Sequence, residues 1–318
     1  MLRFVATANR LTLHIENLAL KITGNTIPIE FVDEPTHLQI VVEQLHTLNE
    51  IAIDTEFDSF NKQYGIQLQL VQVFNGATCF LIDPIKIKNL EPLWSVFTNT
   101  AICKLIYAGA NDVDVLKRHG CRPANLFDIQ IAAELCKWPV TSLSAVLYQE
   151  FEVTPDKSIQ AAGWSNRPIS NRQMAYAAND VIYLPRLKEQ LLSEIREKQL
   201  GNMLQEQNIK LESASSKDYF PKLTDKQRKK YSRYSQQKLL ALKILVDKYA
   251  QEVNLPPYKI VGDAFMEEIV QDVQLFLAQP FPEKKFHYLV NKSYWFKEAF
   301  LEIMHSIDPS IGWAYKRN

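Results

Sequence analysis

The sequence has few glycines and no glycine-rich phosphate-binding loop. Only nine glycines occur among 318 residues, and none of them forms a G-x-x-x-x-G-K pattern, which excludes a P-loop nucleotide site. Long apolar runs are absent too. No segment approaches the length needed to span a bilayer, and polar side chains interrupt the first part of the chain throughout. We therefore expect a protein without a membrane segment.

Cysteine is also scarce. The chain has four, which form no C-x-x-C pair and have no histidine at zinc-finger spacing: Cys79, Cys103, Cys121 and Cys136. This pattern is typical of reduced, mostly buried thiols, so we expect a soluble cytoplasmic protein without a zinc knuckle. A hydrophobic fraction of 47% is enough to build the core of one large or two moderate domains.

Charge is divided unevenly along the chain, although the formal net charge is zero. Residues 1–216 carry 19 Lys and Arg against 24 Asp and Glu, and residues 217–318 carry 17 against 12, which gives net charges of −5 and +5. Near the start of the second part, basic residues alternate with tyrosines, a composition suited to a nucleic-acid backbone. The alternative is an ordinary solvated helix start. The residues are Lys226, Arg228, Lys229, Lys230, Tyr231, Arg233 and Tyr234.

Two carboxylates follow a short apolar run. The run at residues 51–53 predicts a buried strand that leads directly into Asp54 and Glu56. Side chains two residues apart on a strand point to the same side, so these carboxylates would repel each other and resist desolvation. A divalent cation that prefers hard oxygen ligands, Mg²⁺ or Mn²⁺, would remove this cost. A strand that ends in a solvated acidic turn is the structural alternative.

Three further polar residues lie on predicted helices. Tyr176 and Asp180 are four residues apart in a segment that Ser170 could N-cap, so the phenol and the carboxylate would share one helix face. Asp112 follows an apolar run at 101–107 and lies near the start of another predicted helix, whose N-terminus it could simply stabilise. Taken singly, each of these residues has an adequate structural explanation.

Taken together, the five residues resemble the motifs of a known enzyme family. Asp-x-Glu, a downstream Asp and Tyr-x-x-x-Asp resemble the three exonuclease motifs of the DEDD superfamily of 3′–5′ exonucleases, in the DEDDy branch. Within that branch the chain is most similar to the ribonuclease D family, over roughly residues 27–195. The supporting stretches are L-I-Y-A-G-A-N-D-V-D-V-L at 105–116, L-F-D-I-Q-I-A-A at 126–133, S-L-S-A-V-L at 142–147 and D-K-S-I-Q-A-A-G-W-S-N-R-P-I-S at 156–170.

The resemblance implies a metal-dependent 3′–5′ exoribonuclease. Such an enzyme releases nucleoside 5′-monophosphates from RNA 3′ ends, and we expect a role in processing tRNA or another structured RNA. Two divalent ions, Mg²⁺ or Mn²⁺, would be held by four carboxylates, and Tyr176 would orient the attacking water. The implied metal ligands are Asp54, Glu56, Asp112 and Asp180.

Other polar residues around these motifs have weaker assignments. Four residues of the preceding segment could either contact the substrate backbone or brace the helix that carries Tyr176. We favour substrate contact for Lys157, Gln160 and Arg167 and bracing for Trp164. Asp128, within L-F-D-I-Q, fits a helix N-cap better than a metal ligand.

The periodicities predict an α/β fold. Strands are expected near 29–32, 51–56, 67–74 and 78–82, with a hairpin turn at 75–76. Short strands and helices then alternate, and helices dominate to about residue 198. This order predicts a mixed sheet flanked by helices, in agreement with the ribonuclease H-like fold that the resemblance implies.

Composition divides the chain into four parts. Residues 1–26 form an N-terminal extension without an assigned role, and 27–200 form the exonuclease domain. A polar linker is expected at 201–220. Residues 221–318 are expected to form a small all-α domain, in which 241–270 resembles the helicase-and-RNase-D C-terminal (HRDC) module.

Two alternative functions remain open. A DNA-directed 3′–5′ exonuclease would share the same carboxylates, which do not distinguish ribose from deoxyribose. A degenerate domain that binds RNA without cutting it would be expected to lack one or more of the carboxylates, whereas this chain keeps all four. No protein partner can be inferred from the sequence.

Overall fold

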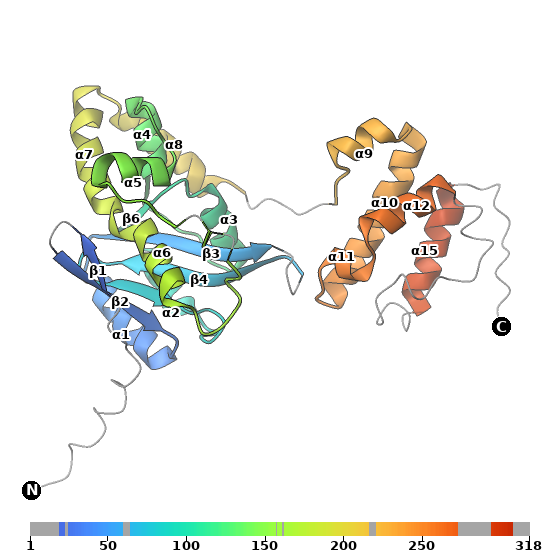
Figure 1. Ribbon diagram of the computed structural model, residues 1–318, viewed down its shortest axis with the longest axis horizontal. Helices are drawn as coiled ribbons and strands as arrows, with labels where there is room; N and C mark the ends of the chain where they lie inside the picture. The colour runs from blue at the N-terminus through green and yellow to red at the C-terminus, as the bar shows by residue number, and fades with distance from the viewer. Residues whose placement is uncertain are drawn as a thin grey trace, which may run out of the picture. The chain divides into compact units, whose positions relative to one another are not determined.

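The chain divides into two units. The computed structural model describes residues 19–22, 25–59, 64–156, 158–160, 162–215, 221–272 and 294–307. One unit combines Met1–Asp58 with Leu68–Lys217, and the other combines Ser59–Gln67 with Asp218–Asn318. Figure 1 labels the elements of both units, which are considered separately below.

A mixed sheet forms the centre of the first unit (Figure 1). In the described residues it has seven strands in the order β1-β2-β5-β4-β3-β6-β7. The β1–β2 and β4–β5 pairs are antiparallel, whereas β2–β5, β3–β6 and β6–β7 are parallel. The strands are β1 (Ala19–Ile22), β2 (Asn25–Val32), β3 (Glu50–Ser59), β4 (Ile66–Phe74), β5 (Cys79–Ile82), β6 (Cys103–Ile106) and β7 (Leu126–Asp128). The predicted mixed α/β sheet is thus confirmed, and β1 lies in the extension left without a role.

The inner strands are apolar because the sheet is covered on both faces. Residues 68–74 of β4 and all of β5 are buried, and β3 begins with the buried Ile51, Ala52 and Ile53. Such strands have continuous apolar runs where a one-sided strand would alternate. The predicted turn between β4 and β5 forms: Asn75 Oδ1 accepts from the amides of Ala77 and Thr78 at 2.9 and 2.7 Å.

Eight helices in the described part of the first unit flank this sheet. Helix α1 packs with α2, α6 contacts β5, α7 contacts β6, and α4 contacts both α7 and α8. The apolar faces of α6 and α7, which include Val181, Leu187 and Leu191, are fully buried in the core. The helices are α1 (Pro35–Leu45), α2 (Glu91–Phe97), α3 (Ala110–Arg118), α4 (Ile129–Cys136), α5 (Leu143–Phe151), α6 (Asn171–Ile182), α7 (Leu184–Glu197) and α8 (Gly201–Ser213).

Helix α8 lies in the segment expected to be a linker. It covers the first 13 residues of 201–220 and lies along the edge strand β7. Its Glu212 Oε1 accepts from the Leu126 amide at 2.7 Å, and its Asn208 Oδ1 accepts from the Asp128 amide at 3.2 Å. The helix therefore satisfies N–H groups that an exposed edge strand would leave unpaired.

The described parts of the second unit are helical, apart from the short 64–67 segment. Helix α10 contacts α11, α12 and α15, and its Leu239, Leu242 and Val246 are buried with Phe296 and Phe300 of α15. These helices confirm a helical C-terminal region, whereas its likeness to an HRDC module and the four domain boundaries stay predictions. No helix among the described residues is both long enough and apolar enough to cross a bilayer. The helices are α9 (Asp225–Lys230), α10 (Arg233–Glu252), α11 (Pro257–Ile260), α12 (Asp263–Gln271) and α15 (Tyr294–Ile307).

Candidate active site

Strand β3 carries two of the predicted site residues beyond the end of its parallel neighbour. The register pairs Ala52 of β3 with Leu105 of β6, and β6 ends one residue later at Ile106. Asp54 and Glu56 therefore lie past the carboxyl end of β6. In open α/β sheets this edge is the usual position of a ligand site.

Helix α6 brings the other predicted pair to the same place. Ser170 is its N-cap, as expected: Ser170 Oγ accepts from the Gln173 amide, and the Gln173 side chain accepts from the Ser170 amide. This capping box fixes the start of the helix. Tyr176 and Asp180 follow on one face, both half-buried.

Three carboxylates converge at this edge of the sheet. Asp54, Glu56 and Asp180 each present an oxygen within 4.8 Å of the others. They come from a strand and from a helix more than a hundred residues further along the chain. All three are half-buried, so each keeps some access to solvent.

Asp112 lies beside this cluster but bonds to the strand backbone. It is in the first turn of α3, which begins just after β6. Both the amide and the hydroxyl of Thr55 donate to Asp112 Oδ1, at 3.2 and 2.5 Å. Three of the four predicted ligands thus form the compact group, and the fourth contacts the residue between Asp54 and Glu56.

Crowding of these carboxylates makes ionisation unfavourable. Burial, followed by the charges of Asp112, Asp180 and Glu56, raises the pKa of Asp54 well above its usual range. Burial and then the neighbouring carboxylates raise the pKa of Glu56 to about 9 and that of Asp180 to about 8. The pKa of Asp112 rises less, to about 6, because burial is opposed by the hydrogen bonds from Thr55. Burial, with the same carboxylates, also raises the pKa of Tyr176.

This donor set fits a divalent cation. The cluster offers only hard carboxylate oxygens, as Mg²⁺ and Mn²⁺ prefer. A bound cation would also offset the repulsion that raises the pKa of each of these groups. The residues present are therefore suited to hold a metal.

Comparison with known proteins agrees with this geometry. The sequence profile of the 3′–5′ exonuclease family matches residues 29–196, which is more than half of the chain. The chain belongs to the 3′–5′ exonuclease family. Ribonuclease D from Shewanella sp. (strain ANA-3) is 34% identical over 182 residues, covering 54% of this chain and 45% of that protein. Ribonuclease D from Escherichia coli (strain K12) is 37% identical over 159 residues, covering 49% of this chain and 42% of that protein.

The similarity to ribonuclease D is confined to part of these relatives. The aligned part of the chain spans less than half of the length of either protein. Among solved structures, the catalytic core of RRP6 from Trypanosoma brucei superposes with a TM-score of 0.75 at 23% identity, covering 94% of this chain and 84% of that one. At this identity the structural match establishes the exonuclease fold alone.

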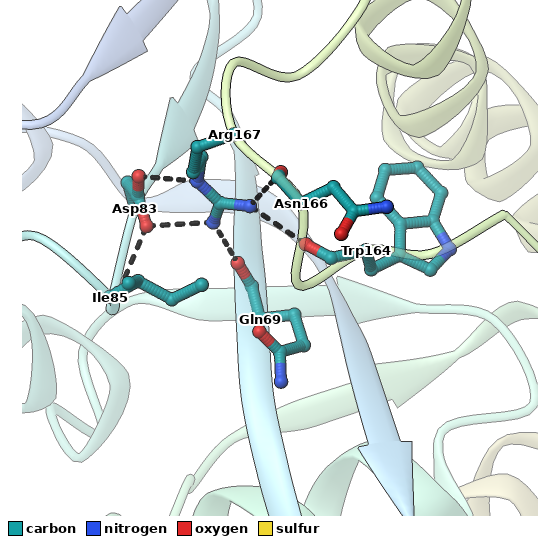
Figure 2. A network of polar contacts seen from close by, with 6 residues as sticks. All are labelled: Gln69, Asp83, Ile85, Trp164, Asn166 and Arg167. Atoms are coloured by element: carbon teal, nitrogen blue, oxygen red, sulfur yellow. Dashed lines mark hydrogen bonds and ion pairs between the residues drawn. The ribbon is translucent and has the colours of Figure 1, made fainter. Parts of the chain in front are cut away.

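Two of the residues predicted to contact substrate, Gln160 and Arg167, differ in their exposure to solvent. Gln160 is exposed in a turn at 158–160, and its role stays a prediction, whereas Lys157 lies outside the described residues. Figure 2 shows that Arg167 faces the protein, because its Nε, Nη1 and Nη2 atoms all donate to protein oxygens. The geometry therefore favours a structural role for Arg167 in place of the predicted substrate contact. Asp128 is the N-cap of α4, as expected.

Sequence reasoning missed two residues that bond to the carboxylates of this candidate site. Thr55 binds Asp112, as described above, and Gln72 Nε2 donates to Asp54 Oδ2 at 3.4 Å. Gln72 is fully buried on β4. An amide in the middle of an apolar strand is a signal that could have pointed to Gln72, because buried polar groups need partners.

Proposed function

We propose that this chain is a metal-dependent 3′–5′ exoribonuclease that releases nucleoside 5′-monophosphates from RNA 3′ ends. The observation that carries the proposal is the convergence of Asp54, Glu56 and Asp180 at one edge of the sheet, with Tyr176 one helical turn from Asp180. Membership of the 3′–5′ exonuclease family supports the reaction. The names of the ribonuclease D relatives support RNA as the substrate.

In this proposal the carboxylates hold two divalent ions, Mg²⁺ or Mn²⁺. Asp54, Glu56 and Asp180 supply the compact set of oxygens, and Asp112 supplies the fourth carboxylate while Thr55 holds it in place. When bound, such ions lower the pKa of a water and stabilise the departing 3′-oxygen. The protein's own contribution is to keep several negative oxygens close together in a half-buried position.

Tyr176 has a different role from the carboxylates. Burial and the negative charges around it favour the neutral phenol, so its hydroxyl keeps its proton at neutral pH. A neutral phenol can orient a water by a hydrogen bond, but it is a poor general base. We assign Tyr176 to positioning the attacking water.

The test is the direction and the metal requirement of cleavage. A single-stranded RNA is labelled at its 5′ end or at its 3′ end and incubated with the full chain, with and without Mg²⁺ or Mn²⁺. We expect the 3′ label to appear at once as mononucleotide and the 5′ label to remain on a shortening ladder, only with metal present. Asp54→Asn and Asp180→Asn should abolish the release of mononucleotide and the shortening of the 5′-labelled strand. Glu189 is an exposed carboxylate of α7, and Glu189→Gln should leave both products unchanged.

Three results would reject the proposal. One is cleavage by Asp54→Asn in excess EDTA that is as fast as cleavage by the unsubstituted protein. A second is faster cleavage of a DNA strand of the same sequence, which would make this chain a DNA-directed exonuclease. The third is tight RNA binding without cleavage under all metal conditions, which would indicate a binding module.

A further inference from the structure

A buried ion pair joins the end of β5 to the segment that precedes α6. Arg167 Nε donates to Asp83 Oδ2 and Arg167 Nη2 donates to Asp83 Oδ1, both at 2.7 Å (Figure 2). The side chain of Asp83 is completely buried, and that of Arg167 is 16% exposed. Bidentate pairing of this kind fixes geometry as well as charge.

The same guanidinium also binds three backbone carbonyls. Its Nη1 donates to the carbonyls of Trp164 and Asn166, at 2.7 and 2.8 Å, and its Nη2 donates to the Gln69 carbonyl of β4 at 2.7 Å. Figure 2 shows Arg167 between Gln69 of β4 and the turn that contains Trp164 and Asn166. One side chain thus ties the backbone of 164–167 to two strands of the sheet.

Trp164 links this network to Tyr176 of the candidate site. Its side chain is buried, with 2% exposure, and its ring centroid lies 6.2 Å from that of Tyr176, at an interplanar angle of 45°. This separation is within the range of direct aromatic contact. Trp164 Nε1 has no hydrogen-bond partner among the described residues, so ring packing is the contact that matters here.

The backbone of α6 alone does not set the direction of the phenol. The capping box at Ser170 and Gln173 fixes where the helix begins, and this places the Cα of Tyr176. The orientation of the phenol also depends on χ1 and χ2, which the neighbouring side chains select. Trp164 is a neighbour that is itself held by a buried network.

We propose that Asp83 and Arg167 are positioning residues: they hold Trp164 against Tyr176 and so direct the phenol toward the carboxylate cluster. This inference rests on the proposed function, in which Tyr176 orients the attacking water. It gives the Asp83–Arg167 pair a role in the chemical step, although neither residue belongs to the cluster.

A double-mutant cycle on kcat tests the proposal. Arg167→Lys keeps the charge but cannot make the bidentate pair and the carbonyl bonds together. We expect it to lower kcat by roughly 10- to 100-fold with little change in KM, as for other misplacements far from the chemistry. In a Tyr176→Phe background the same change should lower kcat by less than about threefold, because the two residues act as one unit.

Lys188→Met is the matched control. Lys188 pairs with Glu50 and has a similar side-chain exposure of 19%, and its ammonium lies over the ring of Phe127, outside the Arg167 network. In the unsubstituted protein and in the Tyr176→Phe variant, Lys188→Met should change kcat by less than about twofold, as expected for an independent site. Equal reductions by Arg167→Lys in the two backgrounds would overturn the proposal.

A second measurement does not depend on catalysis. With 3-fluorotyrosine placed only at position 176, the metal-free full chain is expected to give one narrow ¹⁹F resonance. Arg167→Lys should broaden or shift it, and Lys188→Met should not. An inactive but otherwise intact protein would refute the proposed function, and this spectrum would still decide whether the network orients Tyr176. An unchanged resonance in a folded Arg167→Lys protein would overturn the positioning role.

Substitutions at Trp164 cover the case in which Arg167→Lys does not fold. Trp164→Phe removes no hydrogen bond and keeps an aromatic ring. It should therefore retain the ¹⁹F spectrum and most of the kcat of the unsubstituted protein. Trp164→Leu keeps an apolar side chain but no ring, and it should reproduce the loss expected for Arg167→Lys. Identical spectra for the Phe and Leu variants would overturn the proposal.

Discussion

At the level of single residues, the fold holds carboxylates close together although their negative charges repel one another. Asp54 has a strongly raised pKa because it is buried beside three other carboxylates. Asp54→Asn should therefore raise the free energy of unfolding of the metal-free protein at neutral pH by about 1–2 kcal/mol. Urea unfolding in EDTA measures this change, with Glu189→Gln as the exposed control. Loss of stability in Asp54→Asn would show that the charge is already compensated without metal.

The pH dependence of stability follows from the same residues. Folded Glu56 and Asp180 have pKa values of about 9 and about 8 in place of their ordinary values of 4.5 and 3.8. The folded metal-free protein therefore holds protons that the unfolded chain has released, so its stability should fall as the pH rises from about 5 to about 9. Unfolding in EDTA across this range tests the sign. Saturating Mn²⁺ should reduce the slope, and a flat profile without metal would contradict the prediction.

Tyr176 should affect the chemical step and little else. Removal of its hydroxyl in Tyr176→Phe is expected to lower the single-turnover rate by roughly 10- to 10³-fold, the range of one positioned catalytic group. RNA affinity and Mn²⁺ affinity should stay close to those of the unsubstituted protein, because the phenol carries no charge. A Phe variant with an unchanged single-turnover rate would show that this ring only packs against Trp164.

The sequence predicted the identity of these residues better than their contacts. Asp54, Glu56 and Asp180 were recognised from spacing and from a family resemblance, and the structure brings them together. The bonds from Thr55 to Asp112 link residues 57 positions apart, and no periodicity within either segment encodes them. Arginine is a residue type that often binds phosphates, which is why Arg167 was expected to contact substrate. Its actual partner, Asp83, directly follows β5, and nothing in the sequence indicates that this carboxylate is buried.

At the level of elements, α8 shows how tertiary contacts override composition. Only Leu204 and Asn208 are buried among its residues, so the segment has the polar composition of a linker. Its position is set by hydrogen bonds to β7 and by Lys117, whose Nζ donates to the carbonyls of Glu212 and Ala214. The strands expected near 29–32, 51–56, 67–74 and 78–82 stand out in the sequence as apolar runs, and their predicted positions agree with β2, β3, β4 and β5.

Asn208 gives a direct test of this docking. Asn208→Ala removes the acceptor for the Asp128 amide, which is buried. An unpaired buried N–H should lower the free energy of unfolding by about 1–3 kcal/mol. Asn202→Ala, an exposed position on the same helix, should cost less than about 0.5 kcal/mol. If both variants unfold at the same urea concentration, α8 does not contribute to the stability of this unit.

At the level of the whole molecule, the division of the chain departs from the order of its sequence. Residues 59–67 run from the last residue of β3 to the second residue of β4, but they group with the C-terminal helices. Within that unit, Tyr64 Oη donates to Asp247 Oδ1 of α10 at 2.8 Å, and Gln251 Nε2 donates to Tyr64 Oη at 2.7 Å. Composition along the chain predicts breaks between consecutive segments only, so it could not predict this insertion.

The uneven charge of the two parts of the chain predicts separate tasks within the proposed exoribonuclease, with RNA bound by one part and cut by the other. Of the five basic residues near α9, Lys230 already bonds to Glu267, and Arg228 donates to a backbone carbonyl. Lys226, Lys229 and Arg233 are exposed. We therefore expect these three to contact phosphates, in a unit whose described residues include no carboxylate cluster like that of the other unit.

Replacing all three by glutamine should weaken binding without affecting the chemistry. The slope of log K against log salt for a long single-stranded RNA should become shallower by about two, since each lost phosphate contact contributes about 0.7. The turnover of a short oligonucleotide should stay unchanged, because the carboxylates proposed to act in the chemical step belong to the other unit. Lys86→Gln with Lys88→Gln, two exposed positions of the first unit, controls for a general change in net charge. Equal affinity of the triple variant and the unsubstituted chain across the salt titration would show that the basic start of the C-terminal unit is a solvated surface and that RNA is captured elsewhere.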